Sequence, residues 1–160
     1  MGYLFDTNIF IRSKNEMPSD VWPTFWSKMS ALINSGKVFT SEKVKEEIER
    51  GNDELMQWLK DNAPSSFYCP TDDDVMSKYG EVQRWASGTG RFTPSALNEF
   101  ASVADAFLVA TAAAKNMVVV TYETPDPNSK RRVKIPDACT AMGVRYCDLN
   151  TALKELGVQI

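Results

Sequence analysis

Residues 104–121 read Ala-Asp-Ala-Phe-Leu-Val-Ala-Thr-Ala-Ala-Ala-Lys-Asn-Met-Val-Val-Val-Thr, and this stretch decides the fold class. Its Ala-rich first part favours a helix, because alanine has the highest helix propensity. The β-branched run at 118–120 predicts a short buried strand. A strand that directly follows an apolar helix is typical of α/β folds, in which helices connect the strands of a parallel sheet.

The rest of the chain continues this alternation of helices and strands. We expect further strands at residues 2–5, 38–40 and 144–147. Apolar spacing and capping residues predict helices at 19–36, 41–50, 53–62, 72–86, 94–115 (with a break near Ser102) and 150–156. The basic, proline-rich stretch at 124–136 is expected to be the longest loop. These elements predict a parallel sheet covered by helices on both faces.

Length and composition restrict the class of protein. The 160 residues suit a single domain at 1–160 and are too few for two ordinary ones. No apolar stretch approaches the roughly 18 residues that span a bilayer, and the uncharged N-terminus does not match a signal peptide. Three cysteines without a C-x-x-C spacing fit a reducing compartment. We therefore expect a cytoplasmic protein that does not bind a membrane.

The chain contains no histidine. This excludes Ser–His and Cys–His nucleophile pairs, histidine-bound zinc and acid–base hydrolysis of RNA by histidine. Any catalysis must therefore come from carboxylates, Lys, Tyr, Cys or a metal ion. The net charge of −3 does not exclude a nucleic-acid partner, because binding needs only a local basic surface.

Two acids directly follow predicted strands. Asp6 comes after the strand at 2–5, and Glu123 lies just past the strand at 118–120. Ligands of open parallel sheets bind outside the carboxyl ends of the strands, so both acids lie where a ligand is expected. Taken singly, Asp6 could equally be the cap of the next helix.

Two further acids lie on or near the inner face of predicted helices. Glu47 is about 60° from the inner face defined by Val44 and Ile48, at 100° per residue. Asp105 shares its face with the apolar stripe of its helix, and the nine residues after it are uncharged. A buried carboxylate needs a partner, and a bound cation would supply one. The alternatives are a boundary Glu47 paired with a nearby Lys or Arg, and an Asp105 that only caps its helix.

The four acids together resemble the PIN-domain family of nucleases. The resemblance covers nearly the whole chain and rests on Phe5-Asp6-Thr7-Asn8, Ser41-x-x-Val44-x-x-Glu47-Ile48, Asp105-x-x-Leu108-x-Ala110-x-Ala112 and Val120-Thr121-x-Glu123, in this order. It implies a three-layer α/β/α sandwich around a parallel sheet of four to five strands, divalent metal at the acids, and cleavage of RNA. Many small prokaryotic members of the family are the toxins of toxin–antitoxin pairs.

The resemblance carries catalytic and metal-binding roles over to Asp6, Glu47, Asp105 and Glu123. Oxygen ligands suit Mg²⁺ or Mn²⁺. We expect Asp6 and Asp105 to be direct ligands, and Glu47 and Glu123 to be ligands or bases that position a water.

The sequence leaves the identity of the fourth acid open, because the family usually has Asp where this chain has Glu123. Asp126 or Asp137 could take its place. Three polar side chains are expected to support the acids or a phosphate by hydrogen bonds, or else only to cap turns: Thr7, Asn8 and Thr121.

The densest basic run lies at residues 130–134. Its charged members could hold an RNA backbone, and a solvated loop is the other interpretation: Lys130, Arg131, Arg132 and Lys134. The sequence therefore predicts a metal-dependent endoribonuclease whose partners would be RNA, an antitoxin protein and a second copy of the chain. The alternative is a PIN-like scaffold that binds RNA or protein and no longer cuts.

Overall fold

A computed structural model describes residues 2–51 and 53–160. Five strands form one sheet in the order β3-β2-β1-β4-β5, and every pairing is parallel. The strands are β1 (Tyr3–Phe5), β2 (Val38–Ser41), β3 (Tyr68–Cys69), β4 (Val118–Val120) and β5 (Tyr146–Cys147). Central β1 aligns Leu4 with Phe39 on one side and with Val119 on the other. The predicted α/β class with a parallel sheet is confirmed.

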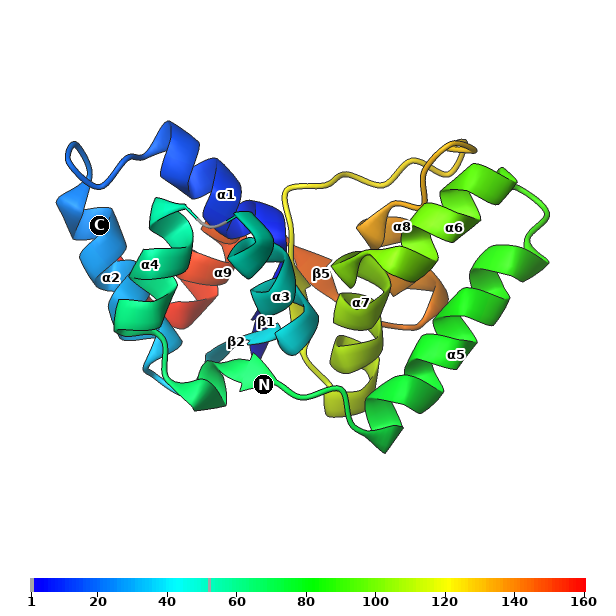
Figure 1. Ribbon diagram of the computed structural model, residues 1–160, viewed down its shortest axis with the longest axis horizontal. Coiled ribbons are helices and arrows are strands. Elements are labelled where there is room, and N and C mark those ends of the chain that lie inside the picture. Colours follow the sequence, from blue (N-terminus) through cyan, green and yellow to red (C-terminus); the bar gives the residue numbers. More distant parts are fainter. Residues whose placement is uncertain (1, 52) are drawn as a thin grey trace.

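Helices flank the sheet and complete three layers. They are α1 (Thr7–Glu16), α2 (Pro23–Ile33), α3 (Glu42–Gly51), α4 (Glu54–Asn62), α5 (Asp73–Gly88), α6 (Pro94–Ser102), α7 (Ala104–Lys115), α8 (Ile135–Ala141) and α9 (Leu149–Leu156), with a 3₁₀ turn at Ser65–Phe67. Figure 1 shows β1 between α2, α4 and α9 on the left and α5 to α8 on the right. The predicted break near Ser102 is confirmed, since α6 and α7 meet there at 64°.

Several elements differ from the predicted ones. The helix expected from Ser19 begins at Pro23. Three elements were not predicted: α1, β3 and α8. Most of α8 lies beyond the predicted loop at 124–136. Strand β3 has only two residues, too few for a periodic pattern, and it exists through its pairing with β2. Helix α8 begins Ile135-Pro136, and proline suits the first turn of a helix because no backbone donor is needed there.

Helix α7 connects the core to the edge of the sheet where the acids lie. Its small, buried residues pack against α5, which lies beside it in Figure 1. Phe107 of α7 stacks on Tyr79 of α5 with ring centroids 4.2 Å apart. Asn116 ends the helix in the left-handed conformation at φ 56°, and the chain turns directly into β4. The N-terminus of α7 is thereby fixed at the carboxyl edge of the sheet.

Within residues 2–51 and 53–160, no single helix is both long and apolar enough to span a bilayer, and only the bent pair of α6 and α7 reaches the required length and composition.

Candidate functional site

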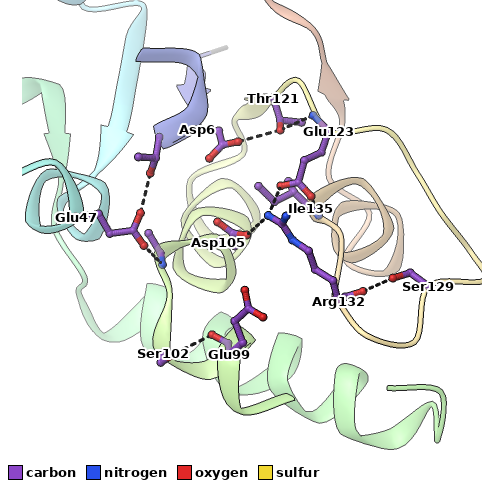
Figure 2. A network of polar contacts seen from close by, with 12 residues as sticks. Asp6, Glu47, Glu99, Ser102, Asp105, Thr121, Glu123, Ser129, Arg132 and Ile135 are labelled. Atoms are coloured by element: carbon purple, nitrogen blue, oxygen red, sulfur yellow. Dashed lines mark hydrogen bonds and ion pairs between the residues drawn. The ribbon is translucent and has the colours of Figure 1, made fainter. Parts of the chain in front are cut away.

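The four predicted acids lie around one space at the carboxyl edge of the sheet (Figure 2). Asp6 follows β1, and Glu123 lies just past β4. Asp105 is the second residue of α7, and Glu47 projects from α3. The chain therefore brings together carboxylates from four separate segments, because parallel strands β1 and β4 are neighbours and end at the same edge.

Asp6 is the most buried of these acids, with 2% of its surface exposed. Its Oδ2 accepts a hydrogen bond of 3.0 Å from the hydroxyl of Thr121. The same hydroxyl accepts a bond of 3.1 Å from the backbone N–H of Glu123, so Thr121 connects the two acid-bearing segments. Asp6 also stands at the N-cap position of α1. Burial and the nearby Glu123 raise the pKa of Asp6 to about 6.

Glu47 is held by two elements other than its own. Its Oε2 accepts a bond of 3.0 Å from the Thr7 hydroxyl, and its Oε1 accepts one of 2.7 Å from the backbone N–H of Ala104. The carboxylate therefore joins α1 and α3 to the first turn of α7, whose N-terminus favours a negative charge. The interpretation of Glu47 as a boundary acid paired with a Lys or Arg is wrong, because both of its oxygens accept hydrogen bonds and it forms no ion pair with a Lys or Arg among the described residues.

Asp105 projects into the space between the other acids. The N-cap of α7 is Val103, and among the described residues none donates a hydrogen bond to the Asp105 carboxylate, so the capping interpretation is wrong. Its side chain is 17% exposed. Burial, with Asp6 and Glu123 nearby, raises the pKa of Asp105 to about 8, against the opposing effect of Arg132.

Arg132 is the cation of this site, and the sequence analysis did not connect it to the acids. Its Nη2 lies 3.8 Å from Oδ2 of Asp105 and 3.5 Å from Oε2 of Glu123 (Figure 2). No Lys or Arg lies near Asp105 in the sequence, and the fold brings Arg132 to it from a different segment. The Ser129 hydroxyl bonds the Arg132 carbonyl at 2.6 Å, which fixes the backbone that carries this guanidinium.

Among the described residues, Glu123 accepts a hydrogen bond at only one of its two oxygens. Its Oε1 accepts a bond of 3.4 Å from the backbone N–H of Ile135, at the start of α8. Its Oε2 is buried and has no hydrogen-bond donor among the described residues, although Arg132 lies near it. A buried carboxylate oxygen without a donor is costly unless a cation or a ligand meets it.

The other candidates lie around the rim of the site or away from it. Asp137 accepts a bond from the backbone N–H of Asp126, so the two alternative fourth acids serve the loop and not the cluster. Asn8 is exposed at the start of α1. Lys130 and Arg131 are exposed on the loop, and Lys134 is the N-cap of α8. Of the basic run, only Arg132 contacts the acids in the part of the chain that the structure describes.

The chemistry of the donor set suits a hard divalent cation. The available ligands are carboxylate oxygens, which Mg²⁺ and Mn²⁺ prefer, and the unpartnered Oε2 of Glu123 is one of them. In residues 2–51 and 53–160, no three acidic or cysteine side chains lie close enough together to hold one ion as they stand. This spacing fits an ion bound by one or two carboxylates plus water and phosphate, which is the usual mode of Mg²⁺.

Comparisons with known proteins agree with this fold. The sequence model of a family described as "Domain of unknown function (DUF4411)" matches residues 3–160. VapBC2 from Rickettsia felis, solved with a DNA fragment from its promoter, has a TM-score of 0.59 at 14% identity, over 92% of this chain and 98% of that chain. FitAcB from Neisseria gonorrhoeae has a TM-score of 0.55 at 20% identity, over 90% of this chain and 95% of that chain. FitAB bound to a DNA fragment has a TM-score of 0.57 at 19% identity, over 91% of this chain and 94% of that chain. The comparison with curated proteins finds no match.

Proposed function

The chain belongs to the DUF4411 family, and we propose that it is a PIN-type, metal-dependent nuclease that hydrolyses RNA. The observation that carries the proposal is the convergence of Asp6, Asp105 and Glu123 in one partly desolvated space. Burial and the neighbouring acids raise the pKa of Asp6 and of Asp105, and Arg132 offsets part of the charge of Asp105 and Glu123. Such crowding of like charges disfavours the folded state, and it is typical of sites built for function.

Asp6, Asp105 and Glu123 are the acids of which one or two would hold Mg²⁺ or Mn²⁺, with water and phosphate as the remaining ligands. When bound, the ion would supply a water of lowered pKa and offset the charge that builds on the scissile phosphate. Thr121 orients Asp6 through its 3.0 Å hydrogen bond. Oε2 of Glu123 accepts no hydrogen bond among the described residues and lies 3.5 Å from Nη2 of Arg132, and it would accept a proton from a water.

Glu47 has a different role in this proposal. Because both of its oxygens accept hydrogen bonds from other elements, it positions α7 and thereby Asp105. We therefore treat Glu47 as a positioning residue, whose loss acts through the geometry of Asp105.

Basic side chains beside the acids suit an RNA backbone. Lys43 and Arg50 of α3 line a small hollow of 90 Å³ that Glu47 also borders. On the other side of the acids, Lys130 and Arg131 are exposed on the loop. Phosphates held at these positions would place the strand across the carboxylates.

The decisive experiment tests cleavage of labelled RNA and single-stranded DNA with Mg²⁺, with Mn²⁺ and with excess chelator. We expect RNA cleavage that needs metal and that is lost in Asp6→Asn and Asp105→Asn. Asp126→Asn is the matched control, because Asp126 lies on the loop and, among the described residues, forms no hydrogen bond with Asp6, Asp105 or Glu123. Cleavage that persists in chelator would contradict the metal mechanism, and binding without any cleavage would favour the scaffold alternative.

The resemblance to small prokaryotic PIN members adds a partner to the proposal. The protein would act as the toxin of a toxin–antitoxin pair and, as a second step of assembly, form a homodimer. Expression of the chain alone should inhibit growth, and co-expression of a small protein encoded beside it should restore growth. Normal growth on expression of the soluble, active nuclease alone would contradict the toxin role and leave the nuclease activity standing.

A further inference from the structure

A pocket of 340 Å³ opens directly beside the acids. Helix α1 contributes Asn8, Ile11, Arg12, Asn15 and Glu16 to its wall. The opposite wall is formed by Tyr122 and Glu123, in the segment after β4. We call it the α1 pocket. Since Glu123 lines both the α1 pocket and the acid site, a molecule bound across the carboxylates reaches the pocket without a gap.

The pocket-lining residues of α1 form one stripe on the helix. They recur at i, i+3, i+4, i+7 and i+8, the spacing of a single helical face. The opposite face of α1 is buried and carries Thr7, Ile9, Phe10 and Ser13. The stripe is not an ordinary charged surface, because Ile11 is 38% exposed on it and two Asn side chains flank that residue.

In the pocket one planar group lies over another. The guanidinium of Arg12 lies 4.4 Å from the ring centroid of Tyr122. The Nε of Arg12 also bonds Glu16 at 2.8 Å, so the guanidinium is held on the ring from a second side. Aromatic rings and guanidinium planes are the surfaces on which proteins stack unpaired nucleobases.

The charges of the pocket favour a base over a phosphate. Arg12 is neutralised by Glu16, and Glu123 adds a further negative charge, so the acids in the lining outnumber the cations. A phosphate would be repelled, whereas a nucleobase is neutral. The amides of Asn8 and Asn15 both donate and accept hydrogen bonds, which matches the edges of a base.

We propose that the α1 pocket binds one unpaired nucleobase of the nucleotide next to the scissile phosphate. The base stacks on the outer face of the Arg12 guanidinium, which the Tyr122 ring supports from its other side, and meets Asn8 or Asn15 with its edge. This inference rests on the proposed nuclease function and extends it: the substrate is single-stranded at the cleavage point, because a base inside a duplex cannot enter the pocket.

The test measures binding of a short single-stranded RNA in excess chelator, which prevents cleavage. Two probes are compared, the intact oligonucleotide and one of equal length whose nucleotides are abasic. The variants are Tyr122→Leu and Asn15→Ala. The matched control is Tyr68→Leu, since Tyr68 is also half-buried and has a cation, Lys45, 5.0 Å from its ring, but lines a different pocket.

We expect Tyr122→Leu to weaken binding of the intact RNA by roughly 5- to 150-fold, the range expected from loss of one stacked base. Binding of the abasic probe should not change, and Tyr68→Leu should bind both probes as the wild type does. Asn15→Ala should show a smaller loss in the same pattern. Thermal melting of each variant establishes that it is folded.

Three results would overturn the inference. Equal loss for both probes would mean that the pocket holds backbone. Wild-type affinity in Tyr122→Leu, in a protein that cleaves RNA, would refute the base pocket and leave the nuclease standing. The same unchanged affinity with weakened binding of a protein partner would assign the pocket to that partner. If the wild type neither binds nor cleaves any RNA, the proposed function itself has failed.

Discussion

Arg132 places its guanidinium Nη2 3.8 Å from Oδ2 of Asp105, although the two residues belong to segments far apart in the sequence. The acid is largely buried, whereas the side chain of Arg132 is 46% exposed. This pair means that the site already contains a cation of its own chain. A divalent metal that binds Asp105 must therefore compete with Arg132.

Replacement of Arg132 by Gln should strengthen metal binding. The pair is half-exposed, so it contributes at most about 1 kcal/mol, which corresponds to a gain of up to about fivefold in affinity for Mn²⁺. Isothermal titration of metal-free protein measures this. Arg131→Gln is the matched control, because Arg131 is exposed on the same loop and pairs with none of the acids in the described part of the chain. Weaker metal binding in Arg132→Gln would show that the arginine supports the ion and does not compete with it.

The stability of the metal-free protein should fall as the pH rises. The pKa of Asp6 is raised to about 6 and that of Asp105 to about 8, so the folded state binds these protons more tightly than the unfolded chain does. Their stabilising contribution is complete below the unfolded values near 4 and is lost as the pH rises through the folded values. Between pH 5 and 8, the free energy of unfolding of the wild type should fall by about 1–3 kcal/mol more than that of Asp105→Asn. Urea unfolding measures this free energy, and an equal pH dependence in the two proteins would contradict the crowding of the acids.

Divalent metal should stabilise the wild type and not the Asp105→Asn variant. Mass action at about a hundred times the dissociation constant adds about 2.7 kcal/mol, or roughly 5–10 °C in melting temperature for a chain of this length. Asp137→Asn should respond as the wild type does, because the Asp137 carboxylate bonds the loop backbone. Thermal melts with and without Mn²⁺ decide this, and a full metal response in Asp105→Asn would remove Asp105 from the ligands.

Glu47→Gln should reduce cleavage by about 10- to 100-fold, as is usual when a residue that orients a metal ligand is lost. Its amide nitrogen cannot accept a hydrogen bond, so either Thr7 or Ala104 loses its acceptor. Glu46→Gln is the control on the same helix, since Glu46 pairs with Lys43 at 3.7 Å on the exposed side. Equal rates in the two variants would assign Glu47 a role in stability alone.

The basic loop can be tested apart from the acids. Lys130→Ala with Arg131→Ala should weaken RNA binding and flatten its salt dependence by about one unit per lost phosphate contact. The double variant leaves Arg132 in place, so any effect on metal binding should be absent. Unchanged affinity at low and high salt would mean that these two residues belong to a solvated loop and do not contact RNA.

Much of the fold could be read from local patterns. The apolar helix at 104–115 and the run Val118–Val120 predicted a parallel α/β sheet, and the break predicted near Ser102 lies between α6 and α7. Helix α1 was missed because its exposed stripe of Asn, Arg and Glu weakens the apolar period. Strand β3 was missed because two residues carry no period.

The site divides in the same way. Asp6, Glu47, Asp105 and Glu123 were placed at one edge from the order of strands and helices, since the carboxyl ends of parallel strands coincide. Their catalytic roles stay predictions. The partners of these acids could not be predicted, because each hydrogen bond or ion pair joins segments that meet only in the folded chain.

Local sequence patterns were therefore enough to predict the alternation of helices and strands, the exclusion of histidine chemistry and the set of candidate acids, because these depend on composition and on local period. Three contacts could be found only in the folded chain: Arg132 with Asp105 and Glu123, Glu47 with the backbone of Ala104, and Tyr122 with Arg12. The physical reason is that a side chain's partner is set by the packing of whole elements, and packing brings together residues whose separation along the chain carries no signal.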